Sequence, residues 1–293
     1  MKLSIVTINY NNAEGLKRTL ESVACQTYRD IEHVIIDGGS TDDSVKIIES
    51  YVRDVSCKMY DVSWVSEKDN GIYNAMNKGI RKATGEYIQI LNSGDVLAAS
   101  DVTERMMEAL RLKIEDCKLK KENGITILYG NMLKSYDMKT IINRDTCGSD
   151  MYTPESFLYF YKGTLNHDCA YIRRDLFDKY GLYNEGMKIC SDWEWYVRAI
   201  VLGGEKPVYT NIDVTIFDMN GVSESRGKNA DLIKKERKEY LEKILPPTVL
   251  HDYDTFSFPV LQYQRLKKFH MWGIVYFLER ILFKLEKWHI LRG

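Results

Sequence analysis

Acidic side chains recur at the ends of short apolar runs in the first third of the chain. Asp37 ends the run IEHVIID, Glu67 and Asp69 lie at and just after the end of VSWVSE, and Asp95 closes the turn LNSGD behind EYIQIL. Turn chemistry explains any one of them, since Asn, Asp, Ser and Gly all favour tight turns. Acids after three successive strands indicate a binding site instead. The carboxyl ends of parallel strands meet at one rim of a sheet, and such sheets bind ligands there.

The elements that must position these acids alternate between strand and helix. Apolar, β-branched runs predict strands, and apolar residues at helical spacing predict the helices between them. The strands are expected at 3–10, 31–37, 62–67 and 86–91, and the helices at 14–25, 43–52 and 71–83. This order predicts an α/β fold with a mostly parallel, doubly wound sheet. Beyond it the pattern is mixed, with strands expected at 124–132 and 136–142 and a helix at 191–203.

Composition narrows the class of protein. A hydrophobic share of 44% with 28% charged residues is ordinary for a globular chain, which argues against disorder. The net charge of −1 gives no reason to expect a nucleic-acid partner. The six cysteines are widely spaced without a C-x-x-C pair, which argues against a zinc site or a redox motif. The N-terminal run is typical of a strand and no run reaches the roughly 18 apolar residues that span a bilayer, so we expect a cytoplasmic protein.

The C-terminal part of the chain differs in charge from the rest. Residues 1–224 carry 27 Lys and Arg against 34 Asp and Glu, a net charge of −7, whereas residues 225–293 carry 14 against 8, a net charge of +6. The last part also interleaves aromatic and aliphatic residues with Lys and Arg, including Trp272 and Trp288. This composition favours a helix on an anionic membrane surface, at the inner face of the cell membrane. The alternative is a helix that packs on the rest of the protein or on a second copy.

Five ordered motifs carry a family resemblance: IIDGGSTDDS, SEKDNGIYNAMNKGIRKATGEYIQILNSGD, HDCAYIRRDLF, SDWEWYVRA and FDMNGVS. Together they resemble the family 2 glycosyltransferases of the GT-A fold, and especially the bacterial branch that builds surface polysaccharides. The resemblance covers about residues 1–225. It implies a GT-A domain over 1–224, with a nucleotide-sugar half at about 1–98 and a smaller mixed acceptor half at about 99–224. Residues 225–293 are expected to form a basic helical extension. It also implies transfer from a nucleotide-sugar to an acceptor hydroxyl, with inversion at the anomeric carbon.

The resemblance assigns a role to each acid at the rim. Asp37 and Asp69 are similar to the family's nucleotide contacts, and Asp95 stands where the family binds a divalent cation, Mg²⁺ or Mn²⁺. Most members carry several acids there, but here Asn92 and Gly94 take the other places. One carboxylate suffices if the diphosphate and water supply the remaining oxygens. The further residues implied near the donor nucleotide are Thr7, Asn9, Asn77 and Lys78, and those near the donor sugar, diphosphate or acceptor are Glu67, Asn92, His167, Trp193 and Ser223.

Asp192, in SDWEWYVRA, matches the family's general base, where a second acid is usual and Ser191 stands instead. Such a base must come within roughly 2.6–3.2 Å of the acceptor hydroxyl. The plainer interpretation of Asp192 is an acid at a helix start, which the helix dipole favours. A lone histidine such as His167 is commonly structural, Trp193 is equally compatible with the core, and the GVS motif with an ordinary turn.

The resemblance implies a UDP-sugar donor and a lipid-linked glycan acceptor in surface polysaccharide synthesis. Three alternatives stay open: a non-catalytic, membrane-associated relative that binds carbohydrate or nucleotide-sugar, a sugar-phosphate nucleotidyltransferase, and an unrelated doubly wound protein whose rim acids are turns. A nucleotidyltransferase usually shows a Gly-rich basic loop after its first strand, which TINYNNAEG lacks. The sequence leaves the sugar, the linkage and the oligomeric state open.

Overall fold

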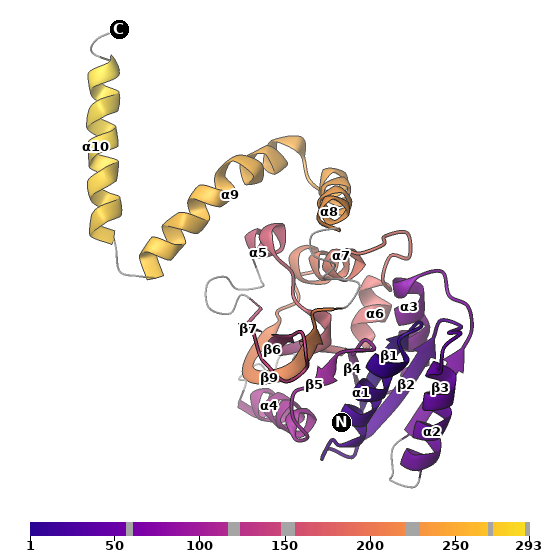
Figure 1. The fold of residues 1–293 in the computed structure, drawn as a ribbon. Helices are drawn as coiled ribbons and strands as arrows, with labels where there is room; N and C mark the ends of the chain where they lie inside the picture. The colour runs from indigo at the N-terminus through magenta and orange to yellow at the C-terminus, as the bar shows by residue number, and fades with distance from the viewer. Residues whose placement is uncertain (57–60, 117–123, 148–155, 221–228, 269–271, 291–293) are drawn as a thin grey trace. The chain divides into compact units, whose positions relative to one another are not determined.

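The computed structural model describes residues 1–56, 61–116, 124–147, 156–220, 229–268 and 272–290 (Figure 1). The chain forms two compact units, Met1–Tyr240 and Leu241–Gly293. The first unit holds the sheet and every residue of the site described below.

Four parallel strands form one side of the sheet of the first unit. They are β1 (Leu3–Asn9), β2 (Ile31–Asp37), β3 (Asp61–Ser66) and β4 (Tyr87–Ile90), in the order β3-β2-β1-β4. All seven residues of β1 and all seven of β2 are buried. A strand covered on both faces needs a nearly continuous apolar run, and this is the pattern of both segments.

The sheet continues through strands that follow β4 in the chain. These strands are β5 (Val96–Leu97), β6 (Ile127–Ser135), β7 (Asn143–Asp145), β8 (Ala170–Arg173) and β9 (Val208–Asp218), and the full order is β3-β2-β1-β4-β8-β6-β9-β5, with β7 on β6. Strand β8 runs antiparallel to both β4 and β6 and so joins the two halves. The predicted α/β fold with a mostly parallel sheet is confirmed.

The strand predicted at 136–142 is wrong. This segment is a turn between β6 and β7, and Asp137 organises it. The Asp137 carboxylate accepts hydrogen bonds from Lys139 N, from Thr140 N and Oγ1, and from Ser135 Oγ. Those bonds hold the pKa of Asp137 well below its usual range. A side chain that bonds to nearby backbone amides in this way competes with strand pairing.

The helices of the first unit surround the sheet. They are α1 (Ala13–Ala24), α2 (Ser44–Ser56), α3 (Ile72–Lys82), α4 (Val102–Asp116), α5 (Phe157–Lys162), α6 (Asp175–Tyr180) and α7 (Ser191–Tyr196), with a 3-10 turn at His167–Cys169 and a π-helical turn at Val197–Leu202. Helix α3 packs directly on β1 and β2. Gly79 allows this close approach, since a β-carbon there would collide with Cγ1 of Val6.

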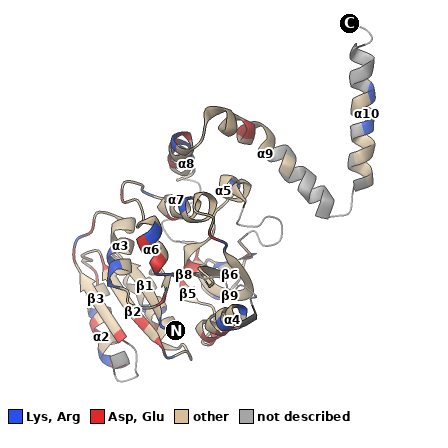
Figure 2. Cartoon of the chain, turned by 180° about the vertical axis from the view of Figure 1, so that it is seen from behind, with Lys and Arg blue, Asp and Glu red and all other residues tan. Residues whose placement is uncertain are grey.

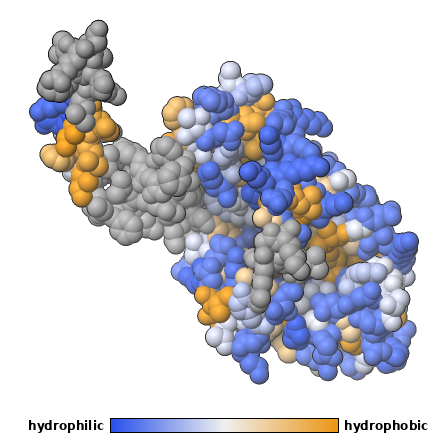
Figure 3. Space-filling model, turned by 45° about the horizontal axis from the view of Figure 1, so that its top comes forward, coloured by the Kyte–Doolittle hydropathy of each residue, from blue (hydrophilic) through white to orange (hydrophobic). Residues whose placement is uncertain are grey.

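Helix α8 (Ala230–Ile244) begins in the first unit, which ends within this helix at Tyr240. The second unit contains α9 (Pro247–Lys268) and α10 (Trp272–Ile290). Helix α10 exposes large apolar side chains, among them Phe277 at 62% and Leu282 at 59%. Figure 3 shows hydrophobic residues gathered on this helix, and Figure 2 shows basic residues between them. Among the helices of the described ranges, none is long and apolar enough to cross a membrane.

Candidate active site

Asp192 is held on both carboxylate oxygens. It lies in the first turn of α7, and its side chain is 15% exposed. The Tyr73 hydroxyl, from α3, donates to Oδ1 at 3.1 Å. On the other side, Nδ1 of His167 lies 3.1 Å from Oδ2. Three segments that are distant in sequence therefore meet at one carboxylate.

The His167–Asp192 contact is an ion pair at neutral pH. Burial alone would lower the pKa of His167, but the hydrogen bond and charge of Asp192, with the charges of Asp168 and Asp95, raise it to about 8. Burial alone would raise the pKa of Asp192, but the hydrogen bond and charge of His167 lower it, with smaller contributions from the Trp193 amide and Tyr73. Each partner thus favours the charged form of the other.

The second nitrogen of His167 ties this pair to the LNSGD turn. Nε2 lies 3.1 Å from Nδ2 of Asn92, while Oδ1 of Asn92 is buried without a hydrogen-bond partner among the described residues. Turning the Asn92 amide by 180° sets Oδ1 as the acceptor for a protonated Nε2. The chain Tyr73–Asp192–His167–Asn92 therefore connects α3, α7 and the turn behind β4.

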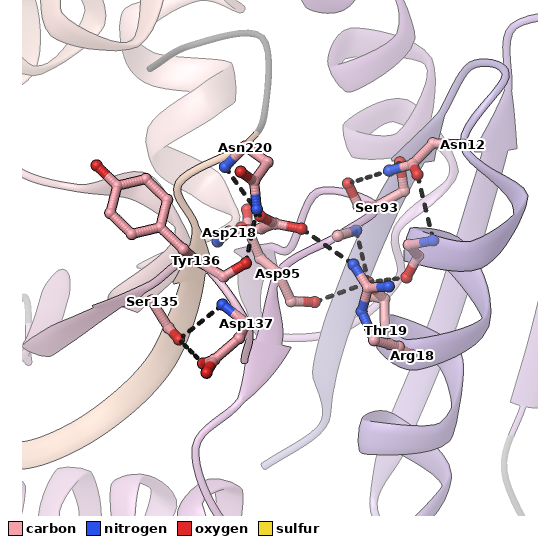
Figure 4. A network of polar contacts seen from close by, with 12 residues as sticks. Asn12, Arg18, Thr19, Ser93, Asp95, Ser135, Tyr136, Asp137, Asp218 and Asn220 are labelled. Carbon is pink, nitrogen blue, oxygen red and sulfur yellow. Dashed lines mark hydrogen bonds and ion pairs between the residues drawn. The ribbon is translucent and has the colours of Figure 1, made fainter. Parts of the chain in front are cut away.

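Asp95, at the end of the same turn, is fixed by backbone contacts (Figure 4). Its Oδ1 accepts a hydrogen bond from the amide of Asp218 at 2.9 Å. The Thr19 hydroxyl donates to the carbonyl of Asp95 at 2.7 Å and accepts from the amide of Gly94. Gly94 has φ +111, a backbone conformation that favours glycine. Arg18 pairs with Asp218 at 3.0 Å and brings a positive charge beside the turn.

The environment of Asp95 disfavours its charged form. Burial raises the pKa of Asp95 well above its usual range, and the nearby charge of Asp168 raises it further. Burial also raises the pKa of Asp168. Within the described ranges, no group of three or more His, Cys, Asp or Glu is arranged to hold a metal ion. Asp95 is thus not part of such a group among the described residues.

Asp37, at the end of β2, has four hydrogen-bond donors around it. Asn9 Nδ2 and Ser40 Oγ donate to Oδ1, while Ser40 N and Ser66 Oγ donate to Oδ2. Burial would raise the pKa of Asp37, but the bonds from Ser40, Ser66 and Asn9 lower it, so the carboxylate stays ionised. Its acceptor positions are all in use, so any further donor to Asp37 must replace one of these four.

Asp69 and Tyr10 both lie over Gly38, next to Asp37. A β-carbon on Gly38 would collide with Oδ2 of Asp69 and would meet the Tyr10 ring at 3.2 Å. Tyr10 is 64% exposed, an unusual position for a large aromatic side chain at the end of a buried strand. Close by, Lys78 forms an ion pair with Glu67 at 2.8 Å. The rim at β1, β2 and β3 thus carries acids, one paired lysine and an open aromatic ring.

Comparisons with known proteins identify the family. The family model described as glycosyl transferase family 2 matches residues 4–181, which is more than half of the chain. An uncharacterized glycosyltransferase of Mycobacterium tuberculosis is 32% identical over 231 residues, which cover 78% of this chain and 79% of the relative. The protein belongs to glycosyl transferase family 2. It is a glycosyltransferase.

Further relatives and solved structures agree with this assignment. A PGL/p-HBAD biosynthesis glycosyltransferase of Mycobacterium bovis is 27% identical over 196 residues, 67% of this chain and 68% of the relative. The TarS 1-349 structure of S. aureus in complex with UDP matches at TM-score 0.60 with 18% identity, covering 88% of this chain and 73% of that one. The mannosyltransferase PcManGT of Pyrobaculum calidifontis matches at TM-score 0.60 with 18% identity, covering 90% and 73%. These likenesses show the GT-A fold.

Three of the residues predicted from the glycosyltransferase's sequence lie inside the packed interior. Thr7 is fully buried, with its hydroxyl 2.9 Å from Nε2 of His33. Asn77 is 1% exposed, and its amide bonds to the backbone of Tyr183 on both sides. Trp193 is 1% exposed and donates to the carbonyl of Phe160. Their roles toward a ligand stay predictions. Ser223 lies outside the described residues.

Two tyrosines of the candidate site are not among the residues predicted from the sequence. Tyr73 lies within a motif that resembles the family, but its contact with Asp192 joins residues 119 positions apart. No local pattern shows such a contact. Tyr10 could have been noticed, because an aromatic residue directly after the polar end of a predicted strand belongs to the same rim as the acids.

Proposed function

We propose that this glycosyltransferase transfers a sugar from a nucleotide-sugar, with a UDP-sugar as the first choice, to an acceptor hydroxyl with inversion. The observation that carries the proposal is the Asp192 carboxylate, bracketed by Tyr73 and His167 and linked through Asn92 to the turn of Asp95. Solved structures with this fold include TarS in complex with UDP-GlcNAc and PcManGT in complex with GDP-Man and Mn²⁺.

Asp192 acts as the general base in one displacement. Its carboxylate takes the proton of the acceptor hydroxyl as that oxygen attacks the anomeric carbon from the face opposite the nucleotide. The new glycosidic bond forms as the bond between the anomeric carbon and the phosphate oxygen breaks, and the nucleoside diphosphate leaves with the electron pair. An ionised carboxylate has about four acceptor sites, so Asp192 can accept from the acceptor hydroxyl while Tyr73 and His167 keep their hydrogen bonds to it.

A divalent cation, Mg²⁺ or Mn²⁺, supplies charge neutralisation for the leaving diphosphate when it is bound. Asp95 is the residue that would hold it. The isolated carboxyl resists ionisation because it is buried near Asp168, so its affinity for a cation is low without a donor. We therefore infer that metal and nucleotide-sugar bind together. At the other end of the donor, Tyr10 offers a ring face to the base and Asp69 offers an acceptor, and Asp37 can accept from the base once one of its present donors gives way.

The acceptor is proposed to be a lipid-linked glycan of surface polysaccharide synthesis, presented at an anionic membrane surface. Exposed apolar residues of α10 include Ile274, Phe277 and Leu278, and the basic Arg280 and Lys284 lie on the same helix. Apolar side chains that enter the lipid interface, with cations that meet anionic headgroups, are the two contributions that hold a helix on such a surface. The side chains of Trp272 and Trp288, expected as anchors, lie outside the described residues.

A thermal-shift panel of UDP-, GDP-, CMP- and dTDP-sugars, each with and without Mg²⁺ or Mn²⁺, tests the donor. A ligand that binds only the native state raises its stability by mass action. We expect one nucleotide class to raise the melting temperature, and to need the metal for most of the effect. A folded protein that responds to none of them would overturn the proposal.

Substitution of Asp192 by Asn separates catalysis from binding. The variant should keep the thermal shift with the selected donor and lose at least ~10²-fold in nucleotide release, the usual contribution of a general base. Normal turnover of the variant would put the base elsewhere. A wild-type protein that binds the donor but neither hydrolyses nor transfers it would instead be a non-catalytic relative.

A further inference from the structure

A glutamate of α8 caps the segment that leads into the helix of Asp192. Glu236 is 9% exposed. Its Oε1 accepts a hydrogen bond from Lys188 N at 2.7 Å, and its Oε2 accepts from Ile189 N and Cys190 N at 3.1 Å each. Three consecutive backbone amides thus converge on one carboxylate.

The next contacts along α8 attach the same helix to α7 itself (Figure 1). The Arg237 guanidinium lies over the Trp193 ring, 5.0 Å from its centre. Tyr240 meets the same ring edge-on, with centroids 5.8 Å apart. Trp193 directly follows Asp192 in the chain. Helix α8 therefore contacts the chain on both sides of Asp192, at residues 188–190 and at Trp193.

We propose that Glu236 is a positioning residue for Asp192, acting through the backbone of residues 188–190. The inference rests on the proposed role of Asp192 as base. A charged acceptor strengthens each of the three bonds. Without it, three amides at a buried position lose their partner, and each unpaired group costs free energy that movement of the segment can relieve. Because α7 starts at Ser191, such movement displaces Asp192 directly.

Displacement of a general base affects the chemical step more than binding. A base works only within hydrogen-bond reach of its proton, and a misplacement of about 1 Å can cost on the order of 10²-fold in rate. The donor nucleotide is proposed to bind at the ends of β1, β2 and β3, which Glu236 does not contact. Loss of Glu236 should therefore lower kcat and leave the affinity for the donor unchanged.

The test compares Glu236→Gln with Glu239→Gln, using the sugar nucleotide selected by the thermal-shift panel and Mn²⁺. Gln keeps the size of Glu but leaves one oxygen for three amides. Glu239 lies on the same helix, is 62% exposed and pairs only loosely with Lys235 at 3.8 Å. We expect Glu236→Gln to lower kcat for nucleotide release about tenfold or more, with an unchanged Kd for the donor and Glu239→Gln as wild type. An unchanged kcat in Glu236→Gln overturns the proposal.

A double-mutant cycle with Asp192→Asn distinguishes positioning from general loss of structure. If Glu236 acts through Asp192, Glu236→Gln should have little further effect on kcat in the Asp192→Asn background, because residues that act as a unit are not additive. A full additional loss there would show that Glu236 acts by another route. If wild-type protein releases no nucleotide, the proposed function fails. The cap, meaning the hydrogen bonds of the amides of residues 188–190 to Glu236, is then still tested by amide hydrogen exchange.

Hydrogen exchange in the wild-type protein needs no variant. The amides of Lys188, Ile189 and Cys190 should exchange slowly, as buried bonded amides do. Exchange at the rate of an open loop would contradict the cap, even if the Glu236 variants failed to fold.

Discussion

The carboxylate of Asp192 lies 3.1 Å from Nδ1 of His167, across 25 positions of the chain. This pair couples the proposed base to the protonated His167, whose other ring nitrogen contacts Asn92 of the LNSGD turn. The partnership keeps Asp192 ionised despite its burial, since the pKa of the acid is lowered and that of the histidine raised. It also makes the charge state of His167 a property that can be measured.

The His167–Asp192 pair should make folding stability depend on pH. The pKa of His167 is raised from 6.5 to about 8 in the folded protein. Its contribution is therefore fully present below pH 6.5 and is lost as the pH rises through about 8. The stability difference between wild type and His167→Gln should shrink by roughly 2 kcal/mol between pH 6 and pH 9, from about 1.4 kcal/mol per pKa unit. Denaturant unfolding at several pH values measures it.

His33 supplies the control for this prediction. Burial lowers the pKa of His33 to about 3, so it stays neutral across the tested range. His33→Gln can destabilise the protein, because His33 bonds to Thr7 and Tyr51. Its pH dependence should have the opposite sign: below about pH 6.5 only the unfolded chain protonates His33, so the stability difference between wild type and His33→Gln should grow slightly from pH 6 to pH 9. The same pH dependence in both variants would show that the His167–Asp192 pair is not its source.

Tyr73→Phe should loosen the position of Asp192 without removing the base. The substitution deletes the hydroxyl that donates to Oδ1 of Asp192 and keeps the ring. A hydrogen bond to a charged group contributes about 1.5 kcal/mol, so we expect kcat to fall about tenfold. Because the Tyr73 bond lowers the pKa of Asp192, the acidic limb of the pH–rate profile should move to higher pH. Steady-state nucleotide release across pH measures both effects.

Tyr183→Phe is the matched control for Tyr73→Phe. The Tyr183 ring packs against that of Tyr73, with centroids 5.8 Å apart, and its hydroxyl is buried without a hydrogen-bond partner in the described part of the chain. Its removal should leave kcat and the pH profile as in wild type. Equal losses in the two variants would assign the effect to packing rather than to the bond with Asp192.

Asp95→Asn should remove the response to metal. Asn keeps the shape of Asp and can still accept from the amide of Asp218, but it has no charge for a cation. With UDP present, the extra thermal shift caused by Mn²⁺ should disappear. In EDTA near neutral pH the variant should melt no lower than wild type, because the raised pKa of Asp95 makes its ionised form unfavourable there. Differential scanning fluorimetry gives both values.

Asp101→Asn tests whether any lost acid has the same effect. Asp101 is 52% exposed and lies 3.8 Å from Arg105 on the surface. It should retain the full Mn²⁺ response. An undiminished Mn²⁺ response in Asp95→Asn would remove Asp95 from the metal site.

Much of the first half of the fold is readable from the sequence, because β1 and β2 are buried on both faces and need continuous apolar runs. The turn at 136–142 could not be predicted from the sequence. Asp137 forms it by accepting hydrogen bonds from backbone amides, and residue propensities do not show such bonds. The site divides in the same way. Acids at strand ends follow from topology, whereas the contacts of Asp192 with His167 and Tyr73 depend on packing between distant segments. The burial of Trp193 depends on α8, beyond the motif that contains it.

Helix α10 should govern attachment to anionic membranes. Replacing Phe277 and Leu282, which are 62% and 59% exposed, by Ser removes apolar surface that we propose enters the lipid interface. Co-sedimentation with vesicles that contain phosphatidylglycerol should fall several-fold, since each large apolar side chain contributes about 1.5 kcal/mol or more when buried. Vesicles of phosphatidylcholine alone should bind weakly in either case, because the basic residues then lack anionic partners. Leu202→Ser, at an exposed leucine of the first unit with 55% exposure, is the control and should bind as wild type. Equal sedimentation of the double variant and wild type would instead favour a helix that packs on protein.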